Sequence, residues 1–167
     1  MHSHLKVWGV ATAAITLLAI SPAALAQEST FTSTCQEIGS GAPAPRGDRE
    51  GDLISVEQDR CHVDSGPLIG SVLVEAIIWE WNKTKTNAVL LSGSGVIRKP
   101  GSTVAFQITE GKLAVTITDG KVTGATSSGR GNDGVATGGA ASLAGKSYTW
   151  SAKSTGRLQF VLDVAIE

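Results

Sequence analysis

The sequence predicts an all-β domain, most simply one eight-stranded antiparallel meander closed into a barrel. Short runs rich in Val, Ile, Thr and Trp alternate with turn signals from residue 53 onward. No stretch after residue 30 combines helical periodicity with capping residues. Eight strands joined by tight turns can close on one another, which removes the open edges. The alternative is a two-sheet sandwich, but its crossing connections need longer loops, and only the Gly-rich segment 128–145 offers one.

The first 26 residues have the pattern of a cleaved export signal. Lys6 supplies a positive start, residues 7–20 are largely apolar, and Ala24-Leu25-Ala26 matches an A-x-A cleavage site. The apolar run is shorter than the roughly 20 residues that span a membrane. We therefore expect cleavage before Gln27, export to the periplasm or the exterior, and no membrane insertion of the mature chain.

Composition excludes several function classes. The chain has 14 basic and 15 acidic residues with no basic cluster, so nucleic-acid binding has no electrostatic footprint. Loss of the leader would remove two of the three histidines and leave only His62. No metal site that needs two histidines can then form.

The two cysteines, Cys35 and Cys61, are expected to form one disulfide in an oxidising compartment. A loop of that length is worth about 3 kcal/mol in the chain-entropy account. The alternative is a reactive Cys61 beside His62. Neighbouring residues in a strand point to opposite faces, so that pair is poorly placed as nucleophile and base.

Residues 27–52 are polar and rich in Gly and Pro, and we expect an irregular N-terminal arm before a barrel domain at 53–167. Tight turns are expected at Lys99-Pro100-Gly101-Ser102, at Glu110-Gly111 and at Asp119-Gly120. Residues 128–145 should form a long loop or a weak strand. The eight expected strands are 53–63, 68–81, 88–97, 103–109, 112–118, 121–127, 146–152 and 157–166.

The stretch 68–81 is apolar on both of its alternating faces, and each face carries one carboxylate, Glu75 or Glu80. A carboxylate on an apolar face is costly unless it is paired, hydrogen-bonded or protonated. In a single-layer barrel the outer apolar face needs a cover. A homodimer or homotrimer interface anchored by Trp79 or Trp81, or the N-terminal arm, would provide one.

The stretch 53–63 starts apolar, and its continuation on the same face reads Gln58, Arg60 and His62. If that face points inward, these residues form a polar ladder in the cavity, and Arg60 or His62 can pair with Glu75 as acid and base. The alternative is a solvated outer face whose ion pairs contribute little. Farther along, Tyr148 and Trp150 share one strand face, where they line a pocket or simply fill the core.

The segment Leu91-Ser-Gly-Ser-Gly-Val-Ile97 with its following Pro-Gly turn, and the later Thr137-Gly-Gly-Ala-Ala141, give the chain a family resemblance. Over 53–166 it resembles the allene-oxide-cyclase-like barrels, which include the dirigent proteins and small secreted bacterial relatives. The resemblance implies a closed barrel with an apolar cavity, no cofactor, and often a dimer or trimer. It also implies isomerisation, cyclisation or steering of a reactive intermediate, with catalytic matches at Glu75, Arg60, His62 and Tyr148.

Two functions follow as hypotheses. The first is a cofactor-free isomerase, cyclase or lyase that acts on a small, mostly apolar molecule by carboxylate acid/base chemistry. The second is a non-catalytic, lipocalin-like barrel that binds such a molecule outside the cytoplasm. A purely structural protein with a filled barrel is a third class. The expected binding residues are Gln58, Trp79, Trp81 and Trp150.

Overall fold

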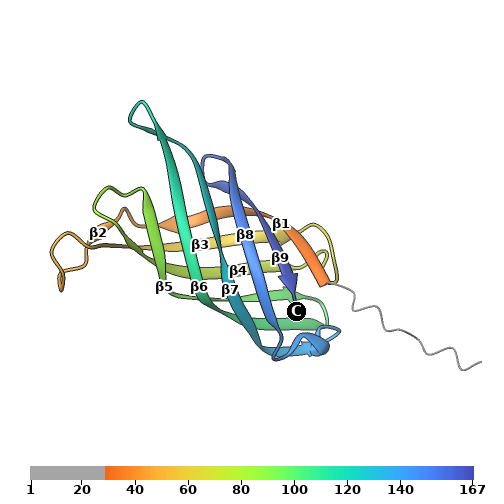
Figure 1. Cartoon of the computed structure of the whole chain (residues 1–167). Coiled ribbons are helices and arrows are strands. Elements are labelled where there is room, and N and C mark those ends of the chain that lie inside the picture. Colours follow the sequence, from red (N-terminus) through yellow and green to blue (C-terminus); the bar gives the residue numbers. More distant parts are fainter. Residues whose placement is uncertain (1–28) are drawn as a thin grey trace, which may run out of the picture.

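The computed structural model describes residues 29–167, and these form one closed antiparallel β-barrel (Figure 1). The expected export signal at 1–26 lies outside the described residues. No helix in the described part of the chain is long and apolar enough to cross a membrane. The elements are β1 Ser29–Ser40, β2 Ala44–Pro45, β3 Leu53–Val63, β4 Val72–Trp81, β5 Asn87–Lys99, β6 Ser102–Thr118, β7 Lys121–Gly138, the short 3-10 helix η1 Ala141–Leu143, β8 Ser147–Gly156 and β9 Gln159–Ile166.

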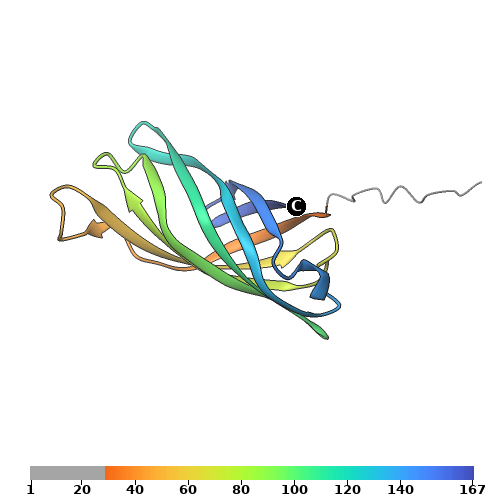
Figure 2. The same cartoon turned by 60° about the horizontal axis from the view of Figure 1, so that its bottom comes forward.

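The barrel closes through β1, which pairs with β9 on one side and with β3 on the other. From β3 to β9 the strands follow one another as a simple meander, and the two-residue β2 pairs only with the start of β3. The prediction of an eight-stranded antiparallel barrel is therefore confirmed, with β2 as an extra strand. Figure 2 shows the strands wrapping around a single interior.

Two expectations about the strands are wrong. One adds a strand and the other removes one, so the number of strands in the barrel stays as predicted. Residues 29–40 do not belong to an irregular arm, because they form β1 and complete the barrel. Conversely, β6 runs unbroken through Glu110-Gly111, where the pairing with β7 shifts register but the chain does not turn. Of the two expectations for residues 128–145, a long loop or a weak strand, the strand is found up to Gly138, as an extension of β7. The Asp119-Gly120 turn is confirmed, and both of its residues have positive φ.

The disulfide between Cys35 and Cys61 is confirmed and fastens the closing seam. The two cysteines are direct cross-strand partners in β1 and β3, and both side chains are buried. Since side chains alternate along a strand, this bond also fixes which residues of β3 point into the barrel. The inward set is Ser55, Glu57, Asp59, Cys61 and Val63. A disulfide of this kind indicates an oxidising, extracytoplasmic environment.

On β4 the inward face carries Glu75 together with Leu73, Ile77, Trp79 and Trp81. The expectation that Trp79 or Trp81 anchors a subunit interface is wrong, because both rings lie inside the barrel. Residues 29–52 leave the middle of the outer face open, since Val74 remains 46% exposed. On that face Glu80 binds Arg46 of the β2–β3 connection, with Oε1 3.0 Å from Nη1.

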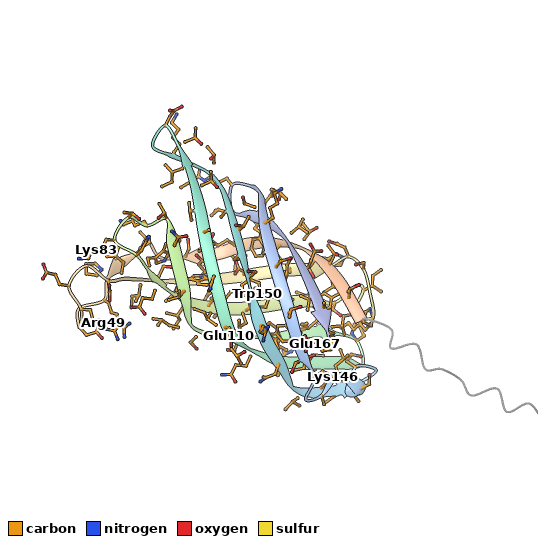
Figure 3. All side chains as sticks on the ribbon, viewed as in Figure 1. Arg49, Lys83, Glu110, Lys146, Trp150 and Glu167 are labelled. Carbon is orange, nitrogen blue, oxygen red and sulfur yellow. A yellow bond between two sulfur atoms is a disulfide. The ribbon has the colours of Figure 1, made fainter. Side chains whose placement is uncertain are left out.

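The two ends of the barrel differ. At the end where β1 begins and β9 finishes, Leu68 of the β3–β4 connection and Leu143 of η1 are buried against the core. This closed half is packed with large apolar side chains from most of the strands. At the opposite end, the β6–β7 hairpin projects beyond its neighbours (Figure 1). Figure 3 labels Arg49 and Lys83 on loops of this open end and Trp150 between the two ends.

Candidate functional site

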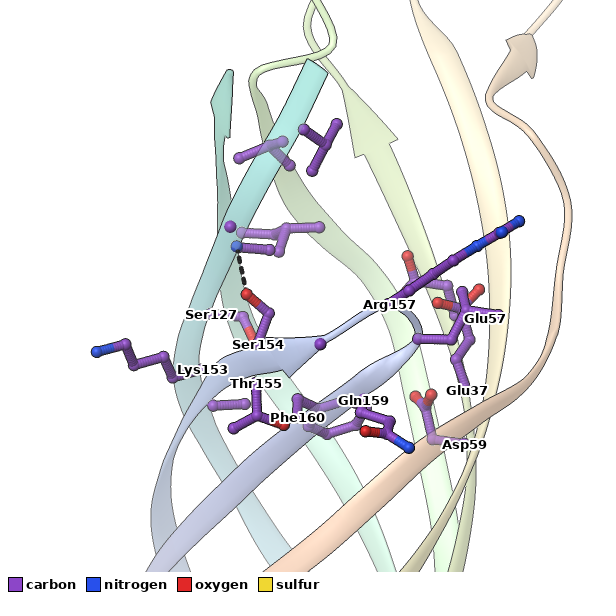
Figure 4. A pocket seen from close by; sticks show the side chains of 18 of the residues that line it. Glu37, Glu57, Asp59, Ser127, Lys153, Ser154, Thr155, Arg157, Gln159 and Phe160 are labelled. Atoms are coloured by element: carbon purple, nitrogen blue, oxygen red, sulfur yellow. Dashed lines mark hydrogen bonds between the residues drawn. The ribbon is translucent and has the colours of Figure 1, made fainter. Parts of the chain in front are cut away.

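The open half of the barrel contains a cavity of about 790 Å³. Its wall combines carboxyl groups from β1 and β3, tryptophans from β4 and β8, and small residues from β7 and β8. Figure 4 shows Glu37, Glu57 and Asp59 on one side and Ser127 and Ser154 on the other. The backbone N–H of Ala125 donates to Ser154 Oγ at 2.9 Å, which ties β7 to β8 close to the end of their regular pairing.

Three carboxyl groups lie in one row across the seam of the barrel. Glu37 in β1 is the direct partner of Asp59 in β3, and Asp59 is the direct partner of Glu75 in β4. Direct cross-strand partners have Cβ atoms roughly 4.5–5.5 Å apart. Glu57 lies on the same inward face of β3, two residues before Asp59. We call Glu37, Asp59 and Glu75 the carboxyl row.

Burial and mutual repulsion act together on this row. Asp59 is 3% exposed and Glu75 is 7% exposed. Burial raises the pKa of Asp59 to about 8, and the charges of Glu75, Glu57 and Glu37 add to the effect. Burial, with a further contribution from the charge of Glu57, raises the pKa of Glu75 to about 7. Near neutral pH these neighbours therefore hold protons that ordinary carboxyl groups would have released.

Within residues 29–167, no basic side chain forms an ion pair with the carboxyl row inside the barrel. The ion pairs found within 29–167 join Arg46 or Arg49 to Asp48, Asp52 or Glu80, all outside the cavity. Neither Asp59 nor Glu75 receives a side-chain hydrogen bond in that range. Their protonation is thus set mainly by desolvation, to which the negative charges of neighbouring carboxyl groups add, and this combination marks carboxyl groups suited to proton transfer.

Two tryptophans are fastened to β3 by their indole N–H groups. Trp79 Nε1 donates to Glu57 Oε2 at 2.8 Å, and Trp81 Nε1 donates to Ser55 Oγ at 2.7 Å. Burial raises the pKa of Glu57, while the bond from Trp79 opposes that rise. These bonds hold the rings at the cavity wall and fix the position of the Glu57 carboxyl group.

The floor of the cavity depends on a glycine of β6. A Cβ atom at Gly111 would lie 3.2 Å from Trp150 Cζ2 and 3.4 Å from Trp79 Cη2. Gly111 has no side chain, so both indole rings can lie close to the β6 backbone at this position. Trp150 borders the open cavity on one side and the closed half on the other. The rings of Trp79 and Trp150 separate the hollow half from the filled half.

Beyond this floor, Glu75 borders a small void of about 30 Å³, room for about one water molecule. Asp133 and Tyr148 border the same void. Tyr148 Oη donates to the Gln107 carbonyl at 3.1 Å. Burial raises the pKa of the Tyr148 phenol, and it raises the pKa of Asp133 to about 6. Glu75 thus connects the open cavity, through Asp59, with a small void in the apolar core that two other polar side chains also border.

The structure separates the residues that the sequence proposed for catalysis. Glu75 and Tyr148 point into the barrel, whereas Arg60 and His62 are exposed on the outer face of β3. Gln58, expected as a binding residue, is exposed beside them. The expected inward polar ladder is wrong because Cys61 points inward to its partner, which turns the residues on either side of it outward.

The residues missed by the sequence reasoning are Glu37, Glu57 and Asp59. The signal for Glu57 and Asp59 was present, since both share the parity of Cys61 in an alternating strand. Glu37 shares the parity of Cys35 in the same way. Trp79, Trp81 and Trp150, expected to bind a ligand, do line the cavity.

Metal binding finds no support in this arrangement. Across residues 29–167 there is no group of three or more His, Cys, Asp or Glu side chains placed to hold a metal ion. The carboxyl row lies along the barrel wall instead of converging on one point.

Comparison of the chain with protein-family models, with curated proteins and with solved structures gives no significant match. Any function must therefore be argued from the cavity, the carboxyl row and the tryptophans.

Proposed function

We propose that the barrel is a cofactor-free isomerase, cyclase or lyase that acts on a small, mostly apolar molecule in its open cavity. Asp59, which lines the cavity, would be the group that exchanges protons with that molecule, and Glu75 beside it would share a proton with Asp59. The observation that supports this proposal above all is their placement. They are direct cross-strand partners, both buried, at the level where an open cavity meets a dry interior.

The chemistry requires one carboxylate and one carboxylic acid at the same time. Two adjacent carboxyl groups with raised pKa values supply this combination near neutral pH, because the first ionisation opposes the second. Asp59, the member of the pair that lines the cavity, takes a proton in its ionised form from a C–H bond of the bound molecule. It then returns a proton to another atom of that molecule, so the pair ends with the same total number of protons.

Tyr148 has a positioning role in this proposal and does not contact the reacting molecule. Its hydroxyl donates to the Gln107 carbonyl and lies at the void beneath Glu75. Arg60 and His62 have no role, because they lie on the outer face.

Several further expectations belong with this proposal. The closed antiparallel barrel is compatible with kinship to the allene-oxide-cyclase-like barrels. The disulfide supports work outside the cytoplasm, in the periplasm or as a secreted protein. The half-exposed Val56 and Val74 on the outer face of β3 and β4 support a homodimer or homotrimer through that face.

A specific observation also supports the second function, a lipocalin-like binding barrel. Trp150 is 8% exposed, and its indole N–H has no hydrogen-bond partner among the described residues. A ligand oxygen in the cavity would satisfy that donor without any reaction. The cavity volume also falls within the roughly 300–1,000 Å³ range of small-molecule sites.

A nitrobenzisoxazole tests the proposed proton transfer, because removal of its one acidic C–H proton breaks the ring N–O bond and gives a coloured phenolate. We expect the oxidised protein to catalyse this ring opening. Asp59→Asn and Glu75→Gln should each lower kcat/KM by about 100-fold or more, the usual contribution of a general base. Glu110→Gln, on the exposed part of β6, is the matched control and should change nothing.

Carboxyl NMR titration provides the second arm of this test. Values well above the ordinary range for Asp59 and Glu75 support the pair as acid and base. Ordinary values for both, or a ring-opening rate that ignores both substitutions, would contradict the enzyme proposal. Ligand binding without turnover would then favour the binding barrel.

A further inference from the structure

The charges around the cavity are arranged in an asymmetric way. Glu37 from β1 and Glu57 and Asp59 from β3 line its wall. The two cations near it are Lys153 and Arg157, and both side chains are exposed. In Figure 4, Lys153 points away from the cavity, and Arg157 extends from the β8–β9 turn over the mouth. Among residues 29–167 neither forms an ion pair with the three acids, so the acidic wall faces the cavity without a partner cation.

Burying anionic groups without a counter-charge is unfavourable, and the protein meets this cost partly by retaining protons. A cation that entered the cavity would reduce the same unfavourable energy by a different route. It would attract the carboxylates, favour their ionised forms and displace the retained protons. The site therefore has a larger gain available from a positively charged ligand than from a neutral one of the same shape.

The aromatic residues provide an independent reason. Every tryptophan within the described residues lines this cavity: Trp79, Trp81 and Trp150. Indole rings attract organic cations through their electron-rich faces and bury apolar surface at the same time. Trp79 also donates its N–H to Glu57, which places a ring and a carboxyl group side by side on the wall.

We propose that the cavity is selective for an organic cation, a protonated or quaternary amine attached to an apolar body. This proposal rests on the cavity assigned under the proposed function and names the ligand class of that site. The apolar body packs against the tryptophans, and the ammonium group lies toward Glu57 and Asp59. A compact metal ion fits less well, since the acids of 29–167 are not grouped to coordinate one.

The test compares two probes of matched shape, phenethyltrimethylammonium and its neutral tert-butyl analogue, in which carbon replaces nitrogen. Because all three described tryptophans line the cavity, their fluorescence reports occupancy directly. At about pH 8.5, above the raised pKa values of Asp59 and Glu75, we expect the cation to bind about tenfold tighter than the analogue. At about pH 5 Asp59 and Glu75 are protonated, and the preference should fall.

Variants localise the effect. Glu57→Gln combined with Asp59→Asn should remove the preference for the cation and leave binding of the neutral analogue. Glu110→Gln should preserve the preference. Equal affinities for the two probes at about pH 8.5, or a preference that ignores pH, would overturn the proposal. The pH series uses the unaltered protein, so it decides the matter even where a variant fails to fold.

The failure of this proposal differs from the failure of the proposed enzyme function. Cation selectivity with no ring opening of the nitrobenzisoxazole leaves a cation-binding barrel. Ring opening that depends on Asp59 and Glu75, with no preference between the two probes, leaves an enzyme for neutral molecules. The first outcome supports the ligand class, and the second overturns it.

Discussion

The closed and open halves of the barrel are built from the same strands but are filled differently. In the closed half, large side chains such as Leu73, Val104 and Phe106 pack in one core, which contains the small void. In the open half, β7 and β8 contribute Ser127, Ala152 and other small residues, and the cavity remains. The strand framework is common to both halves, so side-chain volume at the inward positions decides whether the interior is a core or a site.

The carboxyl row lies at the junction of these halves. Asp59 borders the open cavity, while its partner Glu75 borders the closed void. The disulfide lies one inward position away in both strands of the seam. The tightly packed closed half and the disulfide next to the carboxyl row thus hold these carboxyl groups, whose burial is unfavourable, at the edge of the cavity. In this arrangement the closed half provides tight packing, and the open half provides the space for the proposed chemistry.

The comparison predicts its largest effect for one pair of leucine truncations. Leu73→Ala removes a buried side chain of the closed half, and we expect the free energy of unfolding to fall by about 2–5 kcal/mol. Leu113→Ala removes a half-buried side chain at the cavity, where there is space already, and should cost about 1 kcal/mol or less. Denaturant unfolding of the oxidised proteins measures both. Equal losses would show that the halves do not differ in packing.

The next effect concerns pH. Asp59 and Glu75 have raised pKa values in the folded protein, so between about pH 4 and about pH 8 the folded state binds more protons than the unfolded state. Stability is therefore highest on the acidic side of this range and falls as pH rises through it. The total loss is on the order of a few kcal/mol.

Unfolding curves at a series of pH values measure this slope, and Asp59→Asn should flatten it. The exposed Asp163→Asn is the matched control and should leave the slope unchanged. A protein that became more stable as pH rose over this range would show that the carboxyl row is ionised and compensated in the folded state.

The fold was predictable from local patterns, and the errors have physical causes. Asp119-Gly120 could be recognised as a turn because both residues readily adopt positive φ. Glu110-Gly111 carries a similar signal, but there the glycine serves close packing against Trp79 and Trp150 within a continuous strand. Strand β1 is polar on its outer face and was missed, since its partners β3 and β9 are distant in sequence.

The site was predictable only in part. Glu75 was identified because a carboxylate stands out in an apolar strand. Asp59 and Glu57 were hidden because β3 carries polar residues on both faces, so hydrophobic alternation does not fix its orientation. The cysteine pairing does fix it, through the parity of Cys61. The raised pKa of Asp59 depends on its burial and, in addition, on three other acids, one of them from β1, and no local pattern contains that information.

The smallest expected effect lies on the outer face of β3 and separates the two sides of that strand. Arg60→Gln and His62→Gln change exposed side chains that the sequence alone favoured for catalysis. Since neither points into the barrel, each should alter the free energy of unfolding by less than about 0.5 kcal/mol. Ring opening, probe binding and the pH slope should also stay unchanged in the double variant.

Asp59→Asn, one residue before Arg60 but on the inward face, should alter all three. A loss of activity in the Arg60 and His62 variant comparable to that in Asp59→Asn would place the chemistry outside the barrel and contradict the division between the two halves.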